Sequence, residues 1–191
     1  MAERVPVAVL LSGRGSNMVA LADAAADPAC PYRIALVTGD VPDAPGLDRA
    51  ADMGLPVARL PKPSVGDKVG FYALLDGTLR EAGAEVIALA GFMRILPGDF
   101  VARWDGKILN IHPSLLPKYK GLDTHARAIE AGDKVAGCSV HVVTEELDAG
   151  KVLGRAVVPI LAGDTVDRLA ARVLAAEHRL YPRLLADYVA R

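Results

Sequence analysis

The chain contains few cysteines, no excess of charge of either sign and no long apolar run. Cys30 and Cys138 are too few for a disulfide framework, and they predict a reducing, cytoplasmic setting. The 22 basic side chains are balanced by 23 acidic ones, so the net charge is −1 and we expect no nucleic-acid or membrane partner. No apolar run approaches the ~18 residues of a membrane span. Small-molecule substrates remain, and any anion site must be a local feature.

The apolar residues occur in short runs that alternate with helix-like segments. Among the 191 residues, 52% are hydrophobic and 24% are charged, which indicates a globular domain with a sizeable core. We expect strands at Val5–Leu11, Ile34–Thr38, Val57–Leu60, Val86–Ala90 and Lys107–Ile111, with helices at Met18–Ala26, Gly46–Met53, Val69–Glu81 and Gly98–Arg103 between them. Repeated β-α-β units predict a single α/β domain over residues 1–191, with a mostly parallel, Rossmann-like sheet and helices on both faces.

The pattern changes after the fifth expected strand. A loop rich in proline and glycine at His112–Leu122 precedes a helix at Thr124–Ala131. Cys138–Val143 and Val152–Val158 then have the pattern of strands, and their connection is too short for a helical crossover, so we expect an antiparallel C-terminal strand pair. Asp164-Thr165 is a good N-cap for the last helix. In such a fold, ligands bind at the carboxyl ends of the strands.

The segment Ser12-Gly13-Arg14-Gly15-Ser16-Asn17 connects the first strand to the first helix. Its two glycines let the backbone approach a ligand, and the free N–H groups of the helix N-terminus favour an anion. A dinucleotide site would need a third glycine where Met18 stands, and no Gly-Lys-Ser/Thr of a Walker A motif follows. Taken alone, the segment is equally well a phosphate site or an ordinary β-α turn.

Asn110 and His112 lie two residues apart at the end of the fifth strand, so their side chains share one face. Pro113 favours an extended conformation at His112, which preserves that geometry. An amine that attacks a formyl carbon creates an oxyanion, to which an asparagine amide and a protonated histidine can both donate. The pair therefore suits acyl transfer, and a structural histidine bonded to the backbone is an equal alternative for His112.

Asp148 ends the acidic segment Thr144–Asp148. A carboxylate beside an imidazole would orient the ring and favour its charged form, and it could relay the amine proton through water. Nothing in the linear sequence brings Asp148 to His112, however, and Asp-Ala-Gly is typical of turns. The spacing alone therefore favours a solvated turn residue at Asp148.

Two further segments could contact ligands. Glu177 falls within the apolar stripe of the last helix, so its carboxylate needs a partner, either ligand hydroxyls or an arginine. The run Gly91–Leu96 follows a strand, and its backbone groups with the apolar Ile95 and Leu96 suit a flat heterocycle. The alternative for this run is a plain strand-to-helix connection with Arg94 at the surface.

No metal site is expected. Cys138 and His141 are three residues apart in a strand and face opposite sides, and His125 lies on a separate helix. His141 shares a strand face with Ser139 that could line the ligand cleft, although a bonded core histidine is favoured. Ser114 lacks the Gly-x-Ser-x-Gly elbow of a nucleophilic serine.

Together these segments resemble the phosphoribosylglycinamide formyltransferases. The motifs that carry the resemblance occur in the family's order over nearly the whole chain: Ser12–Asn17, Ala90–Leu96, Asn110–Lys118, Gly121–His125, Ser139–Thr144 and Glu146–Asp148. The resemblance implies the formyltransferase fold, with 10-formyltetrahydrofolate as formyl donor and N1-(5-phosphoribosyl)glycinamide as acceptor in de novo purine synthesis. It also implies that Asn110, His112 and Asp148 are the catalytic trio, with His112 as general acid and Asp148 holding it charged.

The resemblance further implies two sets of binding residues. The substrate set is Gly13, Arg14, Gly15, Ser16 and Asn17 for the phosphate and Glu177 for the ribose hydroxyls. The folate set is Lys68, Met93, Arg94, Ile95, Leu96, Asn110, Val143, Thr144 and Asp148. Three positions depart from some members of the family: Arg14 stands in place of Asn, Asp123 stands in place of a second His, and Lys68 stands near a position where some relatives have a folate-contacting Arg. A lysine lacks the fork geometry with which an arginine would contact the folate.

Other enzymes that use 10-formyltetrahydrofolate are the nearest alternatives. Methionyl-tRNA formyltransferases share the Asn-x-His-x-Ser-Leu-Leu-Pro core but carry a further tRNA-binding domain, for which 191 residues leave no room. Formyltetrahydrofolate hydrolases carry an N-terminal regulatory domain, whereas here the first strand begins at Val5. A regulator that binds nucleotides without catalysis is disfavoured by the intact trio. The sequence is compatible with a monomer or a homodimer.

Overall fold

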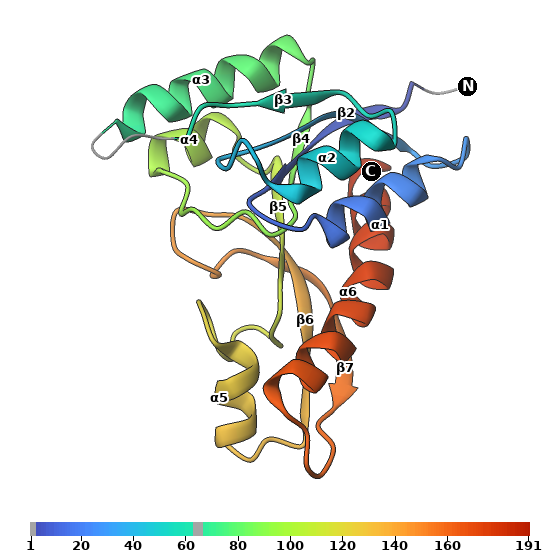
Figure 1. The fold of residues 1–191 in the computed structure, drawn as a ribbon, viewed down its shortest axis with the longest axis vertical. Coiled ribbons are helices and arrows are strands. Elements are labelled where there is room, and N and C mark those ends of the chain that lie inside the picture. The colour runs from blue at the N-terminus through green and yellow to red at the C-terminus, as the bar shows by residue number, and fades with distance from the viewer. Residues whose placement is uncertain (1–2, 63–66) are drawn as a thin grey trace.

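The computed structural model, which describes residues 3–62 and 67–191, contains a seven-stranded sheet in the order β3-β2-β1-β4-β5-β6-β7 (Figure 1). The strands are β1 Val5–Leu11, β2 Tyr32–Gly39, β3 Val57–Arg59, β4 Val86–Leu89, β5 Ile108–His112, β6 Val135–Val142 and β7 Val152–Pro159. The first five strands are parallel, and β6 runs antiparallel to both β5 and β7. The predicted α/β fold, including the antiparallel C-terminal strand pair, is confirmed.

Helices cover both faces of this sheet, as predicted. They are α1 Ser16–Ala25, α2 Pro45–Asp52, α3 Lys68–Glu81, α4 Gly98–Arg103, α5 Thr124–Glu130 and α6 Val166–Val189. Alternate residues of β1 belong to the two sides: Val7 and Val9 pack in the cluster formed with α1, α2 and α6, whereas Ala8 and Leu10 pack with α3 and α4. The unbroken apolar run of β1 is therefore explained by burial on both faces.

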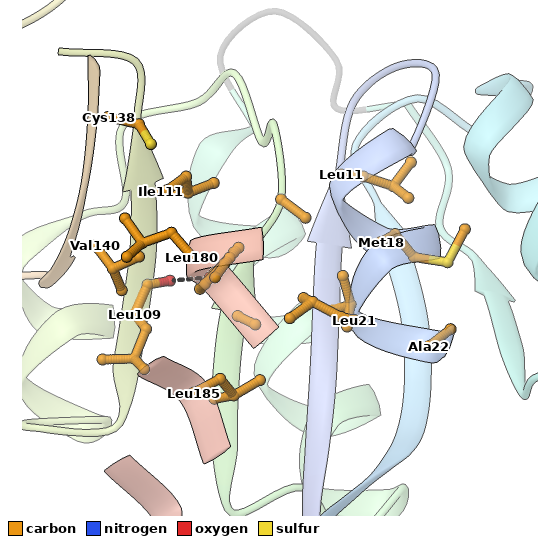
Figure 2. Close-up of a cluster of buried hydrophobic side chains, with 14 of the residues drawn as sticks. Leu11, Met18, Leu21, Ala22, Leu109, Ile111, Cys138, Val140, Leu180 and Leu185 are labelled. Carbon is orange, nitrogen blue, oxygen red and sulfur yellow. Dashed lines mark hydrogen bonds between the residues drawn. The ribbon is translucent and has the colours of Figure 1, made fainter. Parts of the chain in front are cut away.

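Figure 2 shows part of the core on the face covered by α1 and α6, in which Met18 and Leu21 of α1 and Leu180 of α6 belong to one buried cluster. Cys138 of β6 belongs to the same cluster and is fully buried. Burial raises the pKa of the Cys138 thiol to about 12, so this cysteine is a small apolar filler and not a nucleophile.

The sheet changes its winding direction at β1, which lies between β2 and β4. The loops that follow β1 and β4 therefore meet at the carboxyl edge of the sheet, the usual ligand position in such folds. Their backbones are hydrogen-bonded, because the N–H of Ser12 donates to the carbonyl oxygen of Gly91 at 3.0 Å. Two segments about 80 residues apart in sequence are thus brought side by side.

Helix α6 packs along the sheet and is held by hydrogen bonds at its N-terminus and in its second half. Thr165 caps its N-terminus by accepting a hydrogen bond from the N–H of Arg168 at 3.2 Å, as the predicted N-cap requires. The buried Tyr181 hydroxyl lies within hydrogen-bond distance of the carbonyl oxygens of Leu89 and Leu109. None of the helices in the described part of the chain is long and apolar enough to cross a membrane.

Two of the element boundaries that differ from the prediction bear directly on the ligand edge. Helix α1 begins at Ser16 and not at Met18, because Gly15 adopts a left-handed conformation (φ 73°) that starts the helix earlier. Ser16 and Asn17 therefore belong to the first turn of the helix. Strand β5 extends to His112, one residue beyond the predicted end at Ile111, so Asn110 and His112 share a strand face.

Candidate active site

Two adjoining cavities open at the carboxyl edge of the sheet. The larger has a volume of about 510 Å³ and the smaller about 90 Å³, and Asn110 and Asp148 line both. The larger cavity is bounded by the loop after β4, the end of β5 and the start of α5, and His112 lines it as well. The three residues of the expected trio therefore converge on one space.

His112 is 6% exposed and has an oxygen atom beside each ring nitrogen. Its Nε2 lies 2.9 Å from the carbonyl oxygen of Tyr119, and its Nδ1 lies 3.4 Å from Oδ2 of Asp148. Because both neighbours are acceptors, the doubly protonated ring can donate on both sides. The surroundings of His112 thus suit a general acid and differ from those of a histidine bonded only to backbone.

Asp148 lies in a turn, as its spacing favoured, but it is 9% exposed, so the expectation that it is solvated is wrong. The N–H of Gly121 donates to its Oδ2 at 2.9 Å, and Nε2 of His141 lies 3.5 Å from its Oδ1. Burial raises the pKa of Asp148, but hydrogen bonds to the carboxylate, among them that from the N–H of Gly121, and the charge of His112 outweigh burial and hold the pKa below its usual range. The carboxylate is therefore ionised at neutral pH and available to His112.

His141 of β6 pairs with Asn110 of β5 across the antiparallel ladder. Its Nδ1 lies 3.1 Å from the carbonyl oxygen of Val142, so we assign the ring proton to Nδ1. Nε2 then accepts a hydrogen bond from the Asn110 amide at 3.2 Å. His141 is a bonded core histidine, as expected, and the bond fixes the plane of the Asn110 amide and leaves its second N–H free.

The two glycines of the Ser12–Asn17 segment differ in backbone conformation and in the space that a Cβ atom would have. Gly15 has a positive φ, and a Cβ atom there would lie 2.8 Å from Cα of Gly46, so the fold requires it. Gly13 has no positive φ, and a Cβ atom there would have no neighbour within 4 Å. Neither packing nor backbone conformation demands glycine at position 13, so the backbone there is open to the approach of a ligand.

The first turn of α1 also contacts the last helix. Asn17 Nδ2 donates to Oε2 of the buried Glu177 at 2.7 Å, so the partner of this carboxylate is an amide and not the arginine considered from the sequence. Burial raises the pKa of Glu177, and the hydrogen bond from Asn17 opposes that effect. Ser16 faces an open cleft of about 360 Å³, which Arg49 and His178 also line. Arg14 is exposed to solvent.

The expected folate residues fall into three environments. Met93 and Ile95 are 73% and 72% exposed although they line the larger cavity, so an apolar surface borders its mouth. Val143 and Thr144 line the smaller cavity with Leu96. Lys68 is exposed at the first residue of α3 and is absent from the described linings of both cavities, so the structure does not bring it to the others.

Several cavity residues were not found from the sequence. Leu122, Leu147 and Val166 are exposed apolar side chains that line the larger cavity with Met93 and Ile95. His125, whose helix was predicted, also lines this cavity, and burial followed by the nearby charge of His112 lowers its pKa. Exposed leucine and valine have no signal in sequence that distinguishes them from core residues. Within residues 3–62 and 67–191, no group of three or more His, Cys, Asp or Glu side chains could hold a metal ion.

Comparison with known proteins shows what the chain is similar to. Residues 5–185 match the formyl transferase family. The chain is 42% identical over 180 residues to the phosphoribosylglycinamide formyltransferase of Escherichia coli strain K12, which is 94% of this chain and 85% of that protein. It is 46% identical over 182 residues to the trifunctional purine biosynthetic protein adenosine-3 of Gallus gallus, of whose length it spans 18%.

A solved structure has the same fold. The phosphoribosylglycinamide formyltransferase of Brucella melitensis is 46% identical, with a TM-score of 0.94 over 99% of this chain and 97% of that one. At this level the agreement extends over the whole sheet and its helices.

Proposed function

Because this chain belongs to the formyl transferase family, we propose that it transfers the formyl group of 10-formyltetrahydrofolate to the amine of N1-(5-phosphoribosyl)glycinamide. The products are the N-formyl amide and tetrahydrofolate, in a step of de novo purine synthesis, and residues 1–191 act as one formyltransferase domain. The observation that carries the proposal is the convergence of Asn110, His112 and Asp148 on one cavity of about 510 Å³.

The trio can supply the groups that formyl transfer needs. When the amine attacks the formyl carbon, negative charge develops on the formyl oxygen, and the free N–H of Asn110 and the protonated His112 stabilise it. The amine then loses one proton and the departing nitrogen of the folate gains one. Asp148 keeps His112 oriented and accepts or relays the amine proton through water. To reach the formyl oxygen through Nε2, His112 exchanges its contact with the Tyr119 carbonyl for the substrate.

The phosphorylated amine fits the side of the site formed by α1 and α6. The open backbone at Gly13, with Arg14, Gly15, Ser16 and Asn17 beside it, suits a phosphate at the N-terminus of α1. Glu177 and Asn17 offer a carboxylate and an unpartnered amide oxygen, Oδ1, which ribose hydroxyls could satisfy. Each of these features favours a ligand that carries both an anion and hydroxyl groups.

The folate fits the side formed by the loop after β4. The smaller cavity is lined by the Arg94–Leu96 segment together with Val143 and Thr144, a combination that suits a flat heterocycle with polar edges. Met93 and Ile95 give the mouth of the larger cavity apolar walls for an aromatic ring. Lys68 is proposed as a folate contact on resemblance alone.

The test is an activity assay with both substrates. Purified protein mixed with N1-(5-phosphoribosyl)glycinamide and 10-formyltetrahydrofolate should release tetrahydrofolate and the formylated amide in equal amounts, followed by absorbance and mass spectrometry. A metal chelator should leave the rate unchanged, because no step of the mechanism uses a metal. Release of formate without the amine would instead indicate a hydrolase, and no turnover at high enzyme concentration would reject the assignment.

A further inference from the structure

A buried carboxylate outside the expected site joins the two substrate-binding loops. Asp40 directly follows β2 and is 6% exposed. Its Oδ1 accepts a hydrogen bond from the Ser12 hydroxyl at 2.6 Å, and its Oδ2 accepts one from Nε of Arg94 at 2.7 Å. Ser12 belongs to the loop after β1, and Arg94 to the loop after β4.

The same serine extends the connection to the backbone of the second loop. The Ser12 hydroxyl oxygen accepts a hydrogen bond from the N–H of Met93 at 2.8 Å while its hydrogen is donated to Asp40. Arg94 also lies over the ring of Phe71, with its guanidinium carbon 5.8 Å from the ring centroid. One carboxylate, one hydroxyl and one guanidinium thus hold the two loops in a fixed relation.

We propose that Asp40 is a positioning residue that couples the two loops, so that each substrate strengthens the binding of the other. The proposal rests on the function proposed above, in which the residues after Ser12 bind the phosphate and Met93–Leu96 bind the folate. If the phosphate orders the first loop, Ser12 is held in the place from which it accepts the Met93 N–H. Coupling of this kind is reciprocal, because the two binding free energies share one coupling term.

The chemistry of the contact explains why a carboxylate is needed at position 40. Two oxygens are required to accept from both loops at once, and bonds to an ionised acceptor are about twice as strong as neutral ones. An asparagine has a single acceptor oxygen and offers a donor to Arg94, so the guanidinium loses its partner. Asp40→Asn should therefore release the loop of Arg94 while it preserves the volume of the side chain.

The experiment measures the affinity of one ligand in the presence of the other. Calorimetry would give the Kd of a 10-deaza folate analogue, which has carbon in place of the reactive nitrogen, with and without saturating N1-(5-phosphoribosyl)glycinamide. In the wild type we expect tightening of about fivefold or more, the lower end of typical coupling. The coupling ratio is the Kd of the folate analogue without the phosphorylated amine divided by its Kd with it. In Asp40→Asn and in Ser12→Ala this ratio should fall toward one. The double variant should show no smaller ratio than either single variant.

Asp164→Asn is the matched control. Asp164 forms an ion pair with Arg172 in which the two side chains are 5% and 27% exposed, close to the 8% and 30% of Asp40 and Arg94. This variant should lower the unfolding midpoint but keep the wild-type ratio. If Asp40→Asn does not fold, Ser12→Ala carries the test, because a serine hydroxyl is a smaller loss.

The outcomes separate the inference from the proposed function. A wild type that binds both ligands with a ratio of one overturns the coupling and leaves the enzyme assignment intact. An unchanged ratio in both Asp40→Asn and Ser12→Ala gives these residues a structural role alone. A folded wild type that binds neither ligand contradicts the proposed function itself. In steady-state kinetics the coupling predicts that Asp40→Asn and Ser12→Ala raise the KM values of both substrates by a larger factor than they change kcat.

Discussion

At the scale of the residue, the carboxylate of Asp148 lies beside two histidines. Its Oδ2 faces His112 and its Oδ1 faces His141, and the residue adopts a left-handed conformation (φ 48°) that non-glycine residues rarely take. Such backbone strain is kept where the surroundings hold it in place, often at functional sites. The strain, the burial and the ionised state all point to a carboxylate that is held for His112.

Replacing Asp148 by asparagine should lower kcat by roughly a hundredfold or more, because His112 loses the carboxylate that orients it and that would balance its charge when it acts as general acid. The amide can still accept the Gly121 N–H, so the fold should survive. The variant and His112→Ala would be compared by kcat and by far-UV circular dichroism, and the loss in the double variant should be smaller than the product of the single losses. Near-normal kcat in Asp148→Asn would remove Asp148 from the trio.

The buried carboxylate of Glu177 should lower the stability of the free enzyme toward unfolding, and substrate binding should restore it. Burial raises its pKa above the unfolded value of about 4.3. Below that pH the carboxyl is protonated in both states, and as pH rises toward the folded pKa the unfolded state ionises first, which lowers stability. Glu177→Gln should therefore be more stable than the wild type at neutral pH, with a difference that vanishes as pH falls below about 4.

The same variant should bind the substrate less tightly, since an amide accepts weaker hydrogen bonds from hydroxyls than a carboxylate does. Thermal unfolding from pH 3 to 8 and the KM for the phosphorylated amine test both effects. Glu81→Gln, an exposed carboxylate at the end of α3, is the control that should change neither. An unchanged KM in Glu177→Gln would leave the carboxylate with a structural contact to Asn17 and no ligand role.

At the scale of the element, the start of α6 is held by Asp164. Arg172, eight residues after Asp164, donates from Nη1 and Nη2 to the two carboxylate oxygens at 2.7 and 3.0 Å. The N–H of Leu161 donates to Oδ2 of the same carboxylate at 2.8 Å. The hydrogen bond from Arg172, followed by that from Leu161, lowers the pKa of Asp164 to about 2. This cluster fixes where the chain turns from β7 into the helix that presents Glu177.

Asp164→Asn should lower the unfolding midpoint at pH 7, and the difference from the wild type should shrink as pH falls from about 4 toward 2. The sign follows because a depressed folded pKa contributes stability above the unfolded pKa and loses it as the folded group is protonated. Unfolding followed by circular dichroism over this range measures it. Asp99→Asn, which breaks an exposed pair with Arg103 within α4, should have little effect. A difference between Asp164→Asn and the wild type that does not depend on pH would contradict the assigned pKa.

At the scale of the whole molecule, the sheet topology assembles a site whose parts are distant in sequence. Asn17 and Glu177 are 160 residues apart, and Arg94 and Asp40 are 54 apart, yet each pair is in direct contact. The reversal of winding at β1 brings the loops after β1 and β4 together, and the antiparallel β5–β6 pair sets His141 opposite Asn110. The coupling of substrates proposed for Asp40 is a property of this assembly and of none of its elements alone.

Local patterns were sufficient to predict much of this arrangement. Apolar runs and their spacing located the strands, because burial on both faces of a parallel sheet requires continuous hydrophobic sequence. The period of two placed Asn110 and His112 on one face, and the Asp164-Thr165 pair marked the start of α6. The helix boundary at Ser16 was missed, since it depends on the left-handed conformation of Gly15 and its close approach to Gly46.

The amino-acid sequence by itself therefore determined the α/β class, the strand that carries Asn110 and His112, and the family to which the motifs belong. The tertiary structure decided which carboxylates meet which partners: Asp148 with His112, Glu177 with Asn17, and Asp40 with Ser12 and Arg94. The physical reason is that periodicity reports the direction of a side chain relative to its own strand or helix. A contact between loops depends on the order and direction in which the strands assemble, which no local pattern contains.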